Sequence, residues 1–182
     1  MVRSVLFVAV ALTAAAPAAF AADPPSTAAA PGVTAPAMSS DEFLSKLAVG
    51  NKFEIDSSKL AISTTHSEQV KAFATQMVND HGQAAVKMKQ AVTDAKVKAP
   101  ADSLDAKHQA ILDDLKAKKA AAFDKTYVDA QLQGHIDTVA LVEAYAQTGD
   151  NARLKAFASD LLPTLRGHLD HVRKLKTTMG MT

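Results

Sequence analysis

The chain has 182 residues, with 20 Lys and Arg against 19 Asp and Glu, and it contains no cysteine. This length accommodates one domain with a full hydrophobic core, and the balanced charge gives no electrostatic basis for binding nucleic acid. The absence of cysteine excludes disulfides and lipid attachment through a thiol, so packing alone must hold the fold together.

The N-terminal residues 1–21 have the pattern of a cleavable signal peptide. Arg3 precedes the apolar run Val5–Ala16, and Ala19-Phe20-Ala21 supplies a cleavage site with small residues. The run is too short and too rich in alanine for a good membrane span, although an uncleaved anchor is an alternative. Cleavage would remove one basic residue and leave 19 basic and 19 acidic side chains. We therefore expect an exported protein, periplasmic or extracellular, with no integral membrane span after processing.

Residues 22–38 form a second segment of distinct composition. They are rich in proline and alanine and contain no aromatic side chain. Such a sequence cannot bury enough apolar surface to order itself, so we expect a disordered tether. The folded domain is predicted over residues 39–178.

Two capping boxes indicate the first pair of long helices. Ser39 with Glu42 marks the start of a helix that ends near residue 64, and Thr65 with Glu68 marks the start of another that ends near residue 95. Because the connection between them is short, these two helices should pack antiparallel.

The second half of the chain repeats this arrangement after a long crossover. Asp102 or Ser103 is the predicted N-cap of a short helix in the crossover, and long helices follow over residues 120–147 and from Asn151 to about residue 177. No segment alternates with period two. The predicted fold is therefore all-α: a ferritin-like four-helix bundle made of two antiparallel hairpins joined by a long crossover.

A short internal repeat supports the two hairpins. Lys71–Thr75 near the start of the second long helix resembles Lys155–Ser159 near the start of the fourth, and each is followed by a histidine, His81 or His168. The repeat falls where duplicated hairpins would place it.

Four polar residues interrupt the apolar stripes of the long helices. At 100° per residue, His81, His168 and Glu54 lie within their stripes, and His135 lies toward the edge of its own. Counted from the hairpin turns, Glu54 and His81 differ by only about 6 Å in level along the bundle. His135 and His168 have a similar offset, so the four side chains are predicted to meet in one region of the core.

Two interpretations of this cluster follow. In one, Glu54 accepts hydrogen bonds from one or two histidines and the cluster is a satisfied polar core. In the other, Glu54, His81, His135 and His168 form a mononuclear metal site for one divalent ion, with zinc, iron and manganese as candidates. Because each long helix contributes one of the four residues, the metal site is as well supported as the polar core.

Sequence motifs in all four long helices carry a family resemblance. They are Phe53-Glu54-Ile55, Lys59-Leu60-Ala61, Val70–Ala74, Met77–His81, Phe123-Asp124 with Tyr127 and His135, and Leu162–Leu165 with His168. Over about residues 39–177 the chain resembles the exported family catalogued as domain of unknown function 4142, which is placed in the ferritin-like superfamily. The resemblance implies the fold, but the family has no agreed function.

The wider superfamily implies di-iron chemistry, and this sequence departs from its pattern. Di-iron bundles carry Glu-x-x-His on two helices. Here the residues three positions before the core histidines are Val78, Leu132 and Leu165. Since the bridging carboxylates are missing, a ferroxidase or an iron-storage cage is disfavoured, and fold alone does not assign a function.

Two hypotheses of different classes remain. The first is an exported bundle that binds a single metal ion, and the alternative is a non-catalytic structural or interaction module of the cell envelope. An enzyme is the weaker hypothesis, because no nucleophile elbow, cysteine or paired carboxylates are present. We predict no catalytic residues and no nucleic-acid partner.

Overall fold

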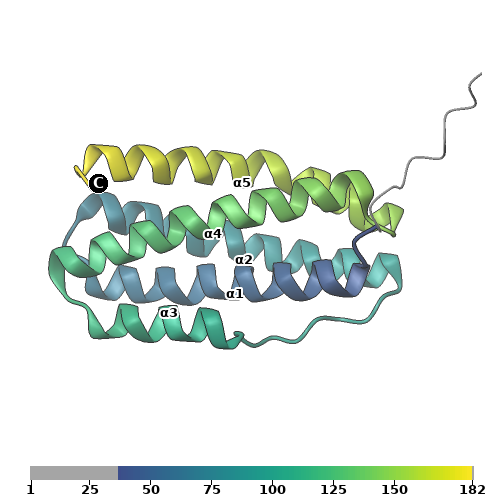
Figure 1. Ribbon diagram of the computed structural model, residues 1–182, viewed down its shortest axis with the longest axis horizontal. Coiled ribbons are helices and arrows are strands. Elements are labelled where there is room, and N and C mark those ends of the chain that lie inside the picture. The colour runs from purple at the N-terminus through teal and green to yellow at the C-terminus, as the bar shows by residue number, and fades with distance from the viewer. Residues whose placement is uncertain (1–36, 182) are drawn as a thin grey trace, which may run out of the picture. The chain divides into compact units, whose positions relative to one another are not determined.

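The computed structural model describes residues 37–181 (Figure 1). The predicted signal peptide and all but the last two residues of the predicted tether lie outside the described residues. All regular elements within the described part are helices: α1 (Ser40–Thr64), α2 (Glu68–Ala95), α3 (Ala106–Ala117), α4 (Ala120–Thr148) and α5 (Ala152–Thr178). No helix in this part is both long enough and apolar enough to cross a membrane. The all-helical prediction is confirmed.

The four long helices run alongside one another, and each packs against two others (Figure 1). The pairs α1–α2 and α4–α5 follow each other in sequence through short connections. Helix α2 also packs against α5, and α1 against α4. The short helix α3 follows a long connection from α2 and lies against α1 and α4. This arrangement brings side chains from α1, α2, α4 and α5 into one shared interior.

The helix starts follow the predicted caps in part. The Ser39 side chain accepts a hydrogen bond from the backbone N–H of Glu42, which confirms the first cap. The second prediction was wrong, because Ser67 rather than Thr65 caps α2. Thr65 lies at the end of α1, where its hydroxyl accepts from the N–H of Ser67. The three-residue connection leaves room for one residue to end a helix and another to begin the next.

The crossover helix begins later than the sequence predicts. Neither Asp102 nor Ser103 caps it, since Asp105 accepts from the N–H of His108 and α3 starts at Ala106. His108 packs against Phe53 with 5.3 Å between ring centroids. Several aspartate and serine residues in this loop could cap a helix, and burial of the α3 apolar face against α1 and α4 selects the register.

Aromatic and aliphatic side chains fill the interior of the bundle. Its largest fully buried members are Phe43, Phe73, Phe123, Tyr127 and Tyr145. Burial of one such side chain contributes about 1.5–3 kcal/mol. Both tyrosine hydroxyls are hydrogen-bonded, to Ser58 and Ser40 respectively. Other buried polar atoms have no hydrogen-bond partner, and they include one nitrogen of each of three histidines.

Candidate metal centre

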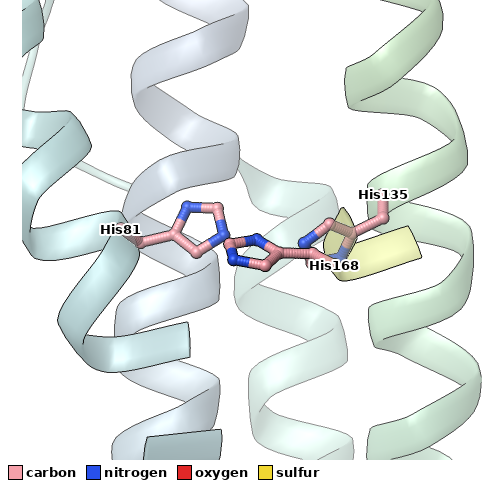
Figure 2. Close-up of side chains that lie close together, drawn as sticks. All are labelled: His81, His135 and His168. Carbon is pink, nitrogen blue, oxygen red and sulfur yellow. The ribbon is translucent and has the colours of Figure 1, made fainter. Parts of the chain in front are cut away.

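Three histidines meet in the interior, one each from α2, α4 and α5. Figure 2 shows the rings of His81, His135 and His168 gathered in the space between the helices. Their ring centroids lie 5.6 Å apart for His81 and His135, and 5.4 Å apart for the other two pairs. The side chains are buried, with exposed fractions of 5%, 1% and 2%. His135, expected at the edge of its stripe, is the most deeply buried of the three.

Helical periodicity explains how each histidine reaches this interior. His81 follows the buried Met77 by four residues, and His135 follows the buried Gln131 by four. His168 lies between the buried Leu165 and Leu169 on the apolar face of α5. Residues three or four apart share one face of a helix, so each imidazole projects into the core with its apolar neighbours.

One nitrogen of each imidazole faces a hydrogen-bond acceptor. Nδ1 of His81 lies 3.0 Å from Oδ1 of Asn51, and Nδ1 of His135 lies 2.9 Å from the backbone oxygen of Gln131. Nε2 of His168 lies 2.9 Å from Oδ2 of Asp80. These oxygens only accept, so the facing nitrogens carry the ring protons and donate. The tautomer of each neutral ring is thereby fixed.

The other nitrogen of each ring has no hydrogen-bond partner. Nε2 of His81, Nε2 of His135 and Nδ1 of His168 are all buried and unpaired. In these tautomers each carries a lone pair. One nitrogen from each ring lies within 4.8 Å of the others. Nitrogens that share a tetrahedral ion at about 2.0 Å lie about 3.3 Å apart, so the rings would have to move closer together to share one ion.

Burial keeps two of these rings in the form that can bind a metal. Desolvation lowers the pKa of His81 well below its ordinary value of 6.5, and the positive charges of the neighbouring His135 and His168 would lower it further. Desolvation also lowers the pKa of His168, although the hydrogen bond to Asp80 acts in the opposite direction. Neutral imidazoles at neutral pH are the state that a metal ion requires.

Glu54, the fourth predicted ligand, lies beside the histidine cluster. The group of potential ligand atoms that lie together contains the three histidines only. Oε1 of Glu54 is 3.8 Å from Nδ1 of His135, which is too far for the hydrogen bond predicted from the sequence. The residue is only 4% exposed and its Oε2 has no partner. Desolvation raises its pKa above 4.5, while the nearby His135 and Gln131 act to lower it.

Two residues that orient the histidines, Asp80 for His168 and Gln131 for His135, were not among the predicted site residues. Asp80 directly precedes His81 in sequence, but it faces α5. A further chain of contacts leads outward from it, since Gln76 Nε2 donates to Asp80 and His171 Nδ1 lies 3.0 Å from Gln76 Oε1. His171 itself is exposed and lies outside the cluster. The position of Asp80, directly before a core histidine in the sequence, could have indicated its role. The role of Gln131 depends on its backbone oxygen, which the sequence does not reveal.

Solved structures with a similar fold share little sequence with this chain. CopM in the Cu(II)-bound form matches with a TM-score of 0.65 and 14% identity, over 79% of this chain and 99% of its own. A crystal structure of a DUF305 fragment from Deinococcus radiodurans matches with a TM-score of 0.65 and 12% identity, over 78% and 97%. CopM in the Ag-bound form matches with a TM-score of 0.62 and 14% identity, again over 78% and 97%. Identities this low establish similarity of fold alone.

Comparison of the sequence gives a match to a protein family and none to a curated protein. No curated protein matches the chain. The resemblance seen in the helix motifs is confirmed over a longer range, because the family match extends across residues 22–175. This chain belongs to the family described as Domain of unknown function (DUF4142).

Proposed function

We propose that this protein is an exported, ferritin-like four-helix bundle that holds one transition-metal ion on His81, His135 and His168. The main observation is that three buried histidines offer ligand nitrogens within 4.8 Å of one another, and that each ring has one buried nitrogen without a hydrogen-bond partner. The opposite nitrogen of each ring is already bonded to an acceptor, as is typical of the outer shell of metal-binding histidines.

A purely structural polar cluster accounts less well for this arrangement. Buried polar atoms are normally paired, and a single water molecule has only two protons to donate. Three unpaired ring nitrogens in one cluster therefore exceed what one water can satisfy. A metal ion accepts all three, which favours the metal site over the envelope-module alternative.

The nearby carboxylates would balance the charge of the ion. Three neutral imidazoles bring no negative charge, and an unpaired charge in a buried site is costly. A cation at the cluster favours the ionised form of Glu54. Together with Asp80, which hydrogen-bonds to His168, Glu54 would offset the two charges of a divalent ion. We thus assign Glu54 to the surroundings of the ion.

Copper is the ion that we propose first. Imidazole nitrogen suits copper, and the affinity of such sites for divalent first-row ions is highest for Cu²⁺. The fold neighbours named as Cu(II)-bound and Ag-bound CopM are compatible with this choice. Zinc, iron and manganese, the candidates from the sequence, have no such support and are compared in the same experiment.

The test is the metal content of the purified protein, produced without a histidine tag. Separate samples receive copper, zinc, iron or manganese, pass through a desalting column, and are measured by elemental mass spectrometry. We expect close to one copper ion per chain. Copper at about 100 times its dissociation constant should stabilise the fold by about 2.7 kcal/mol, seen as a higher melting temperature.

His81→Leu is the decisive variant, and His66→Leu is its control. Both changes remove one imidazole, but His66 is exposed in the connection between α1 and α2. We expect His81→Leu to abolish retention of the ion and the control to keep it. Retention of no ion by the wild type, or equal retention by both variants, would show that the cluster is not a metal site.

A further inference from the structure

A small cavity adjoins the histidine cluster. Its volume is about 20 Å³, and both His81 and His135 line it, whereas His168 does not. A cavity needs about 10–15 Å³ of such space to accept one water molecule. The space beside these two rings is therefore large enough for a water or another ligand of similar size.

Besides the two histidines, the cavity wall combines apolar side chains with three polar ones. Asn51, Glu54 and Thr138 contribute the polar groups. The Asn51 oxygen is already engaged by His81, but Oε2 of Glu54 is buried without a partner. A buried carboxylate oxygen without a donor is costly. The protein supplies no hydrogen-bond donor to this atom, and a molecule in the cavity that Glu54 lines would be able to supply one.

A second, larger pocket lies next to this cavity. It has a volume of about 580 Å³ and lies between α1, α2 and the connection to α3. Asn51 and Met88 line both spaces. These two side chains thus border both spaces, and the Met88 side chain is flexible. A movement of Met88 would offer a small molecule a route from the outer pocket to the cavity.

We infer that the cavity is an exchangeable coordination position, in which a small protic ligand, water in the resting protein, binds the ion and donates a hydrogen bond to Glu54. This inference rests on the proposed function. Three protein ligands with a fourth position left to water distinguish reactive metal sites from closed structural ones. The bundle would then expose its ion to small molecules, which a purely structural metal site does not do.

The glycine residues of the bundle offer a matched pair of variants for a test. A Cβ atom at Gly50, which lines the cavity, would lie 3.7 Å from Oγ1 of Thr138, an ordinary contact. The Gly50→Ala methyl group should therefore fill the cavity without disturbing the helix. A Cβ at Gly167, next to His168, meets nothing within 4 Å. Gly167→Ala makes the same chemical change outside the cavity.

The experiment measures the relaxation rate of solvent water protons in the presence of protein loaded with Cu(II). A water that binds the paramagnetic ion and exchanges with solvent raises this rate. We expect a clear increase for the wild type and for Gly167→Ala, and loss of most of it in Gly50→Ala. Glu54→Leu, which removes the acceptor at similar volume, should also reduce the increase.

Copper content, measured on the same samples, separates the two possible failures. If the wild type holds no copper, the proposed function fails, and this inference fails with it. If copper is bound but the relaxation rate is unchanged in the wild type, the position is closed and only the inference is overturned. An equal increase in Gly50→Ala and Gly167→Ala also overturns it, because the water would then lie elsewhere.

Discussion

Oδ2 of Asp80 lies 2.9 Å from Nε2 of His168, although the two residues belong to different helices. The side chain of Asp80 is 30% exposed, whereas that of His168 is 3% exposed. The contact therefore joins a partly exposed residue to the buried histidine cluster. It engages Nε2 of the ring and leaves Nδ1 of His168 without a hydrogen-bond partner.

Loss of this contact should weaken metal binding more than folding. In Asp80→Asn the amide can offer an N–H to the ring and favour the wrong tautomer. Changes of this kind to the outer shell of a metal site lower affinity by about 10–100-fold. We expect a loss in this range in a competition titration with a copper chelator, with little change in the melting temperature of the metal-free protein. Asp170→Asn, an exposed change on α5, is the control and should leave affinity unchanged.

The stability of the metal-free protein should fall as the pH drops below about 6.5, the ordinary histidine pKa. Burial lowers the pKa of His81 and of His168 in the folded state. Between the folded and the unfolded pKa values, the unfolded chain binds protons that the folded chain does not bind. A lower pH therefore favours unfolding. Each histidine contributes a slope of up to about 1.4 kcal/mol per pH unit between its unfolded and folded pKa values.

Urea unfolding at several pH values between 7.5 and 5.5, with a chelator present, measures this slope. His81→Leu should have a shallower slope than the wild type, since it lacks one of the two groups. Glu54 acts in the opposite sense, because burial raises its pKa and the folded state then holds a proton that the unfolded state releases. Identical slopes for the wild type and His81→Leu would contradict the assignment of a lowered pKa to His81.

A hydrogen-bond network far from the histidines should contribute to stability without affecting metal. Asp150 accepts from the backbone and side chain of Ser40 and from the hydroxyl of Tyr145. It ties the start of α1 to the connection between α4 and α5. Asp150→Ala leaves the buried Tyr145 hydroxyl with one partner fewer, and we expect a loss of about 2 kcal/mol in the free energy of unfolding.

Tyr145→Phe tests the same network from the other side. It removes the hydroxyl and keeps the ring, which stacks on Phe43 with 3.9 Å between centroids. Its cost should be smaller than that of Asp150→Ala, and the double variant should lose less than the two single losses added together. Additive losses would show that the two residues are not coupled. The copper content of all three variants should equal that of the wild type.

Processing of the N-terminus can be measured directly. Arg3, the apolar run and the Ala19-Phe20-Ala21 site predict cleavage after residue 21. We expect the intact mass of protein recovered from the periplasm or the medium to correspond to a chain that begins at Ala22 or Asp23. Recovery of a chain that retains residues 5–16 would refute cleavage. Replacement of Ala19 and Ala21 by bulky residues should prevent processing.

The sequence by itself determined the helices and the faces that they bury. Residues on a helix repeat every 100°, so His81 and His168 could be placed on buried faces without knowledge of any neighbour. The sequence determined the start of a helix less well where several neighbouring residues could each form the N-cap. Thr65 and Ser67 both have cap-forming side chains, and the packing of α1 against α2 decides which one begins the helix.

Only the tertiary structure decided what the cluster can do. Helical periodicity places a side chain on a face, but it does not say which ring nitrogen meets an acceptor on another helix. The acceptors of His81 and His168 are Asn51 and Asp80, each from a different helix. These two contacts between helices, together with the contact of His135 with Gln131 in its own helix, leave one nitrogen of each ring without a partner. The ligand set therefore depends on distances across the bundle, which arise from packing and have no counterpart in the spacing of residues along the chain.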